Sequence, residues 1–95
     1  MATSRIIFRV HALQRLFERK LSVEDVHHVL ATGKTIDRYD DDKPYSSCLI
    51  LGWSRNRPIH IVVAFNEQEN ENIIVTAYEP DPNQWEAGFE RRKVQ

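Results

Sequence analysis

Residues 59–65, with the sequence IHIVVAF, are the stretch that decides the fold of this 95-residue chain. Isoleucine, valine and phenylalanine fill five of the seven positions, and such β-branched and aromatic residues favour strands. Successive side chains of a strand point to opposite faces, so the odd-numbered residues share an apolar face and His60 points from the other one. The stretch therefore predicts a central strand with one face toward the core.

Three further strands are expected on either side of this one. Residues 35–39 alternate with period two, residues 47–53 form an apolar run of strand length, and residues 73–78 again carry β-branched side chains. The connections between these segments are short and polar, and short connections favour antiparallel neighbours. We therefore expect a four-stranded antiparallel meander. Alternation along residues 73–78 places Tyr78 on the same side of this sheet as His60.

Helical patterns flank the four strands. Apolar residues at helical spacing predict a first helix over about residues 9–20. Ser22 and Asp25 resemble a capping box at the start of a second helix, which ends at Gly33. Asp81 followed by Pro82 predicts the start of a C-terminal helix. The expected fold class is α+β, with two N-terminal helices, the four-stranded sheet and a C-terminal helix in a single domain, 1–95.

Composition limits the classes of protein to consider. The single cysteine, Cys48, allows no internal disulfide, which favours a reducing compartment such as the cytoplasm. We recognise no signal peptide and no apolar run of membrane-spanning length, so no membrane association is expected. Only three glycines are present, so a glycine-rich nucleotide loop is excluded and no cofactor is expected.

Charge is unevenly distributed although the net charge is only -1. Residues 1–20 hold five Lys or Arg residues against one glutamate, whereas residues 37–42 hold four aspartates against one arginine. This asymmetry permits a basic surface, and ordinary solvated surface charge is the simpler explanation.

One stripe of the first helix combines a histidine with two arginines. His11, Arg15 and Arg19 stand four residues apart, so they share one side of the helix. Arginine binds phosphate through a planar set of donors and histidine transfers protons, so this stripe is a candidate phosphate site. The alternative is a solvated face whose ion partners are Glu18 and Glu24.

A second candidate group lies in the sheet, where His60 and Tyr78 share a side. A phenol beside a histidine can position or protonate a phosphodiester oxygen. A lone histidine in an apolar strand can equally be structural. No metal site is expected, because the adjacent His27 and His28 diverge by about 100° on a helix.

Four short motifs in the chain resemble those of a known family. They are His11-Ala12-x-x-Arg15-x-x-Glu18-Arg19, Asp42-Lys43-Pro44-Tyr45, Arg57-Pro58-x-His60 and Thr76-Ala77-Tyr78-Glu79-Pro80-Asp81-Pro82 followed by Trp85. From about residue 6 to residue 92 the chain resembles a family of small bacterial and archaeal domains of unknown function. That family is similar to the RelE-type and MqsR-type toxins of toxin–antitoxin pairs. The resemblance implies a RelE/barnase-like fold and cleavage of messenger RNA.

The resemblance also implies roles for the candidate residues. The chain would be a metal-independent endoribonuclease in which protons are transferred by His60 and His11, the phosphate is positioned by Tyr78, and phosphate is bound by Arg15, Arg19 and Arg57. The implied partners are RNA or the ribosome and an antitoxin of the zinc-finger or helix-turn-helix type. The pI near 6.4 leaves two alternatives open, a non-catalytic binding or regulatory module and an inactive toxin relative, because phosphate binding normally requires a basic surface.

Overall fold

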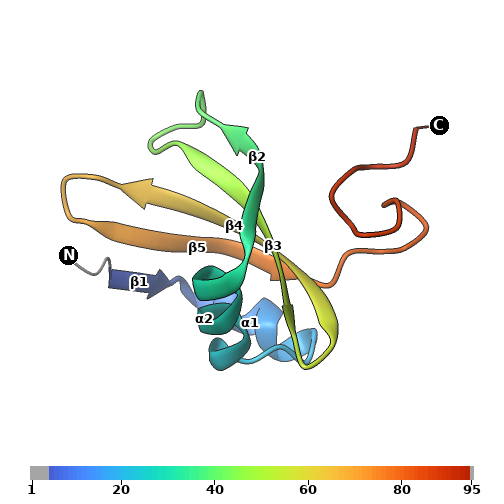
Figure 1. The fold of residues 1–95 in the computed structure, drawn as a ribbon. Helices are drawn as coiled ribbons and strands as arrows, with labels where there is room; N and C mark the ends of the chain where they lie inside the picture. The colour runs from blue at the N-terminus through green and yellow to red at the C-terminus, as the bar shows by residue number, and fades with distance from the viewer. Residues whose placement is uncertain (1–4, 95) are drawn as a thin grey trace.

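A five-stranded mixed sheet with two helices on one face makes up the fold (Figure 1). The computed structural model describes residues 5–94. The strands are β1 (Arg5–Phe8), β2 (Lys34–Tyr39), β3 (Ser47–Ser54), β4 (Arg57–Asn66) and β5 (Glu71–Tyr78), and the helices are α1 (Val10–Glu18) and α2 (Val23–Thr32). The strand order across the sheet is β1-β5-β4-β3-β2. The side covered by α1 and α2 is called the helix face below, and the other side the opposite face.

The expected fold class is wrong in two respects. The four predicted strands are present and pair antiparallel as a meander, but a fifth strand, β1, joins the sheet edge parallel to β5. The expected four-stranded antiparallel sheet is therefore a five-stranded mixed one. The second error is the C-terminal helix, because the described residues after Tyr78 contain only turns and an isolated bridge.

Local hydrogen bonding explains why the C-terminal segment, residues 79–94, is not helical. The Asp81 carboxylate accepts from the backbone N–H of Asn83 at 2.8 Å, so it closes a local turn instead of capping a helix. Further on, Gly88 and Phe89 both have positive φ, 90° and 62°, which a right-handed helix does not allow. The segment instead forms a hook in which Trp85 bridges to Arg92, visible to the right of the sheet in Figure 1.

The core lies between the helices and the centre of the sheet. Ile59 and Ile61 of β4 are fully buried, and α2 contributes Val26 and Val29 to the same cluster. The predicted capping box of α2 is confirmed, since the side chains of Ser22 and Asp25 each accept from the backbone N–H of the other. Burial of this apolar cluster holds the helices on the sheet.

An irregularity in β5 changes which side chains face the core. The register with β4 shifts between Val62 and Val63, so Val75 is an extra residue in β5 and is half exposed. Ile74 and Ala77 therefore both lie in the core although they are three residues apart. Alternation along residues 73–78, as used for Tyr78 above, would place Ile74 on the side of His60, and for Ile74 it is wrong. Among the described residues, no helix is long and apolar enough to cross a membrane.

Candidate functional site

His60 lies at the centre of the opposite face and is fully buried. It pairs with Tyr78 across β4 and β5, and its ring packs edge-on against Trp85 with the ring centroids 4.4 Å apart. Its Nε2 lies 2.8 Å from the carbonyl oxygen of Phe89, and its Nδ1 lies 3.3 Å from the Tyr78 hydroxyl. The expectation that His60 and Tyr78 share one side of the sheet is confirmed.

These contacts assign the proton on the neutral His60 ring. A carbonyl oxygen only accepts, so Nε2 carries the proton and donates to Phe89, and Nδ1 accepts from the Tyr78 hydroxyl. Burial lowers the pKa of His60. The hydrogen bond to Phe89 raises this pKa, whereas the charge of Arg92 lowers it further. His60 is therefore neutral near pH 7, with both nitrogens engaged and no access to solvent.

Tyr78 stands at the border between this buried histidine and an open pocket. The pocket has a volume of about 260 Å³ and is lined by Asp37, Tyr39, Tyr78 and Arg92 together with Trp85 and Glu90. Burial raises the pKa of Tyr78 although Arg92 and Arg19 oppose the rise. Burial also raises the pKa of Tyr39, supported by the neighbouring Asp37. Both phenols are thus protonated donors near neutral pH.

Arg92 brings a positive charge to this pocket. Its guanidinium lies over the Trp85 ring, 5.1 Å from the ring centroid, which is within range of a cation–π interaction. The Arg92 side chain is exposed, and its charge acts on the two phenols and on His60. The pocket therefore combines two neutral donors with one solvent-accessible cation.

Arg19 reaches the site from the C-terminal end of α1. Its Nη1 donates to the carbonyl oxygen of Ala77 at 2.7 Å and to the hydroxyl of Thr76 at 3.2 Å. These bonds lie beyond the four residues of β5 that pair with β1, so Arg19 caps the part of the β5 edge that β1 leaves open. Of the three residues in the predicted helix stripe, Arg19 alone has a side-chain hydrogen bond to the end of the strand that carries Tyr78.

Arg57 has a structural set of partners. Its Nε donates to the Glu79 carboxylate at 2.9 Å, and its Nη1 donates to the Lys20 carbonyl oxygen at 2.9 Å. It therefore joins the start of β4 to the end of α1 and to the segment after β5. To bind phosphate, as expected from the sequence, the Arg57 guanidinium would have to replace its hydrogen bonds to Glu79 and Lys20 by bonds to the phosphate.

The structure does not bring His11 and Arg15 to His60. Both side chains are exposed on α1, whose buried residues Ala12 and Leu16 pack on the helix face, whereas His60 points from the opposite face. The two histidines are separated by the sheet, and the expectation that His11 shares a site with His60 is not met. The cause is the placement of α1, which helical periodicity does not specify.

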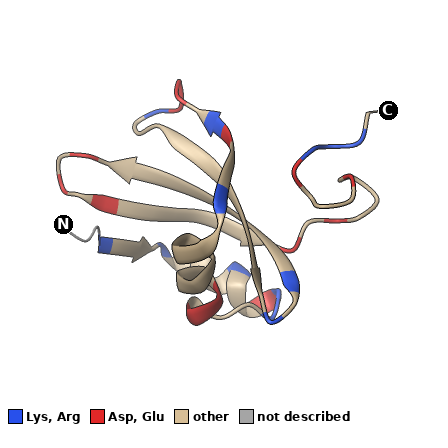
Figure 2. Ribbon diagram, viewed as in Figure 1, with Lys and Arg blue, Asp and Glu red and all other residues tan. Residues whose placement is uncertain are grey.

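Figure 2 shows how the formal charges are arranged along the fold. Lys and Arg residues gather where the end of α1 meets the β3–β4 turn, and Glu residues occupy the β4–β5 turn. Within residues 5–94, no three His, Cys, Asp or Glu side chains lie together as a metal site would require.

The family of the chain follows from its sequence over this same region. Residues 8–79 match the model of a family described as Domain of unknown function (DUF4258). The chain belongs to this family. No curated protein and no solved structure matches it. The match includes His60 and Tyr78 of the DUF4258 domain but ends before the C-terminal segment that supplies Trp85 and Arg92.

Sequence reasoning found Tyr78 but missed Asp37, Tyr39 and Arg92, which line the same pocket of this DUF4258 domain. Tyr39 was visible as the last residue of an alternating strand, but nothing in the pattern related it to Tyr78, which lies three strands away with β3 and β4 between them. Arg92 lies 14 positions after Tyr78 in a segment expected to be helical. The signal that could have related the two tyrosines is that they point from the same face of the sheet. In its register Tyr39 is opposite Ser47 and Tyr78 is opposite His60.

Proposed function

We propose that this DUF4258 domain is a metal-independent endoribonuclease whose site is the pocket between Tyr39, Tyr78 and Arg92. The observation that carries the proposal is the grouping of two protonated phenols and an exposed guanidinium around a pocket of about 260 Å³. Cleavage of RNA through its own 2′-hydroxyl requires an acid, a base and a cation directed at the scissile phosphate. The residues that line this pocket supply all three.

Each proposed role follows from the state of the side chain. The RNA 2′-hydroxyl attacks phosphorus and gives its proton to the exposed carboxylate of Asp37, which lines the same pocket. The bond from phosphorus to the 5′-oxygen breaks, and Tyr78 turns its hydroxyl proton away from Nδ1 of His60 and gives it to that oxygen. The products are a 2′,3′-cyclic phosphate and a free 5′-hydroxyl. Arg92 stabilises the charge that develops on the phosphoryl oxygens.

His60 becomes a positioning residue in this proposal instead of the acid expected from the sequence. It is buried beneath Tyr78, and its Nδ1 accepts a hydrogen bond from the Tyr78 hydroxyl while the Phe89 carbonyl orients the ring. Arg19 fixes the backbone at Ala77, next to Tyr78. Both residues act through Tyr78, so the mechanism depends on the orientation of this one phenol.

The sequence resemblance to RelE-type and MqsR-type toxins supports the same reaction class. Under that resemblance the domain is the toxin of a toxin–antitoxin pair, acts on RNA or at the ribosome in the cytoplasm, and is inhibited by a zinc-finger or helix-turn-helix antitoxin. A gene for a small protein of either type beside the gene for this domain would agree with that assignment.

Induced expression in a bacterial host tests the proposal, with growth and messenger-RNA integrity as the readouts. We expect growth arrest with RNA cleavage from the unmodified chain, and a loss of activity of at least about a hundredfold in Tyr78→Phe, which removes one hydroxyl. Arg92→Gln should lose activity similarly, whereas Arg15→Gln, another exposed arginine, should retain it. Cleavage of purified RNA in the presence of a chelator must follow the same order. Equal activity of Tyr78→Phe and the unmodified chain would contradict the proposal.

A non-catalytic binding module is the second candidate, and the surface of α1 favours it. Val10, Leu13 and Phe17 form an apolar stripe on this helix, with 68%, 42% and 86% of their surface exposed. Exposed apolar patches of this kind mark protein contacts. If the unmodified chain is folded and abundant but leaves growth and RNA unchanged, this candidate replaces the first.

A further inference from the structure

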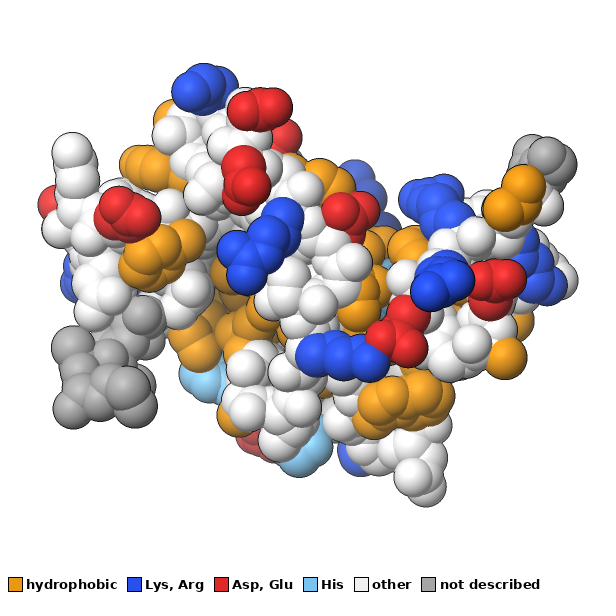
Figure 3. Space-filling model, turned by 45° about the horizontal axis from the view of Figure 1, so that its top comes forward, with side chains coloured by type: hydrophobic (Ala, Val, Ile, Leu, Met, Phe, Trp, Pro, Cys, Tyr) orange, Lys and Arg blue, Asp and Glu red, His pale blue; other side chains and the backbone are white. Residues whose placement is uncertain are grey.

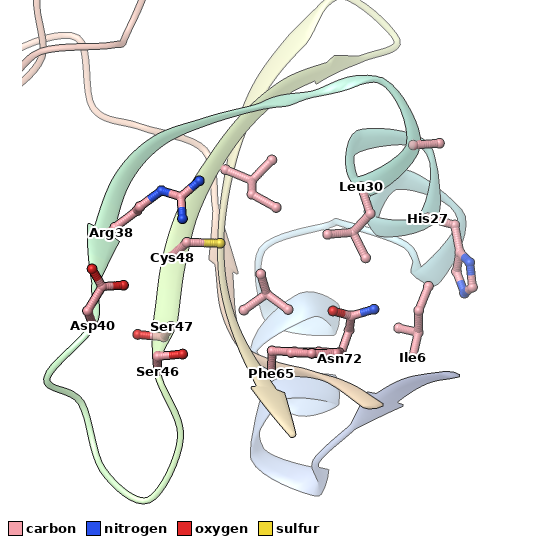
Figure 4. A pocket seen from close by; sticks show the side chains of 13 residues that line it. Ile6, His27, Leu30, Arg38, Asp40, Ser46, Ser47, Cys48, Phe65 and Asn72 are labelled. Carbon is pink, nitrogen blue, oxygen red and sulfur yellow. The ribbon is translucent and has the colours of Figure 1, made fainter. Parts of the chain in front are cut away.

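A second and larger hollow lies on the helix face, away from the pocket beside Tyr78. Its volume is about 770 Å³, within the range of about 300–1,000 Å³ typical of small-molecule sites. The helices cover only part of the sheet, so the strand ends beyond α2 remain open. Three walls surround the hollow, formed by α2, by β1 and by the curved β2–β3 pair (Figure 4).

Apolar side chains line much of this hollow, beside polar ones such as Ser46 and Asn72. Ile6 of β1, Leu30 of α2, Ile50 of β3 and Phe65 of β4 line it and are all only partly buried. Hydrophobic side chains are visible within a hollow in the left half of the space-filling view, with a basic side chain at its border (Figure 3). Covering these side chains with an apolar body would remove their exposed surface from water, which is favourable.

One cation is directed into the hollow. Arg38 stands opposite Cys48 in the β2–β3 register, and its guanidinium extends toward the Cys48 sulfur (Figure 4). The positive charge of Arg38 acts on that thiol. Asp40 also lines the hollow, yet within the part of the chain that the structure describes no carboxylate lies within ion-pair distance of the Arg38 guanidinium. The guanidinium therefore has its donors available.

We propose that this hollow binds a small amphipathic carboxylate, with its apolar body between Leu30, Ile50 and Phe65 and its carboxylate on Arg38. A hollow with apolar side chains along its floor and one accessible guanidinium selects for that combination, because arginine binds carboxylates through two parallel hydrogen bonds. The site lies on the face of the sheet opposite to His60, so it does not depend on the proposed ribonuclease function.

Titration of the ¹⁵N-labelled chain with 2-naphthoate, followed by NMR, tests this site. Amide signals of residues that line the hollow should shift, and those around Tyr78 should not. Arg38→Gln should weaken binding about tenfold to a hundredfold, the range for loss of a charge-assisted hydrogen bond. Arg15→Gln is the matched control, because it removes another exposed arginine, on α1, which contributes no residue to the lining of the hollow, and it should bind normally.

The neutral analogue 2-naphthamide makes the test specific for the carboxylate. The unmodified chain should bind 2-naphthamide more weakly than 2-naphthoate, by the same factor by which Arg38→Gln weakens the binding of 2-naphthoate. Arg38→Gln should not weaken the binding of 2-naphthamide further. Ala31→Phe places a larger side chain at an exposed position in the wall of the hollow and should reduce binding of both compounds. The absence of shifts at millimolar 2-naphthoate, or equal affinity for acid and amide, would overturn the proposal.

Discussion

Replacing His60 by alanine should destabilise the protein strongly. The substitution removes a fully buried ring that contacts Trp85 and Tyr78 and leaves the carbonyl of Phe89 without its hydrogen-bond donor. Loss of a large buried side chain together with an unsatisfied buried acceptor costs about 3 kcal/mol. Since 1 kcal/mol shifts the melting temperature of a domain of this size by about 4–8 °C, the expected decrease is about 12–24 °C.

Thermal unfolding followed by circular dichroism measures this decrease. His11→Ala is the matched control, because His11 is exposed on α1, and a surface substitution of this kind changes stability by less than about 0.5 kcal/mol. If the melting temperature of His60→Ala is as close to that of the unmodified chain as the melting temperature of His11→Ala is, the buried histidine does not stabilise the fold. That result would refute the reasoning.

The pH dependence gives a second signature of the same residue. Burial lowers the pKa of His60 below its ordinary value of 6.5, so the unfolded chain binds a proton at His60 at a higher pH than the folded chain does. Stability from this group is therefore fully present above about pH 6.5 and is lost as the pH falls below it. The melting temperature of the unmodified chain should decrease from pH 7 to pH 5, and His60→Ala should lose that part of the decrease.

Four other substitutions test the packing. Asp25→Asn should cost about 2 kcal/mol in urea unfolding, because the Asp25 carboxylate accepts charge-assisted and hydroxyl hydrogen bonds in a buried position. Burial raises the pKa of Asp25, but the hydrogen bonds outweigh it and hold that pKa well below its usual range, so the unmodified chain should lose stability as the pH falls below about 4. Gly52→Ala should cost about 2 kcal/mol, because the new Cβ would lie 2.7 Å from Cγ1 of Val29 and force α2 away from the sheet; a stability equal to that of the unmodified chain would contradict this close contact. Phe17→Ser should leave the melting temperature almost unchanged, whereas Leu16→Ala, one residue away but buried, should lower it by about 10 °C or more.

The parts of the fold that sequence could predict are those with local signals. Alternation of apolar residues located the four strands of the meander, and the Ser22–Asp25 capping box located the start of α2. The parallel strand β1 has no such signal, because four residues pair with a segment 66 positions away, as in Arg5 with Glu71. The prediction of a C-terminal helix was wrong, because the backbone N–H of Asn83 donates a hydrogen bond to the Asp81 carboxylate and this local bond favours a turn.

The candidate site shows the same division. The side of the sheet shared by His60 and Tyr78 followed from alternation, even though the extra residue Val75 moved Ile74 to the other face. The grouping of His11 with them failed, because the packing direction of a helix depends on tertiary contacts that its periodicity does not contain. The contribution of Arg92 depends on the hook after β5, which no regular pattern indicates.

The parallel pairing of β1 with β5 has a consequence for the order in which the fold assembles. On the ribosome β1 is synthesised before the other strands, yet within the described residues its hydrogen-bonding partner is β5, the last strand to be made. Closing a loop of this length costs more chain entropy than closing the short turns of the meander. The meander can therefore form first, and β1 is expected to join the edge in a late step. Until then, the apolar side chains of Ile6 and Phe8 stay in water.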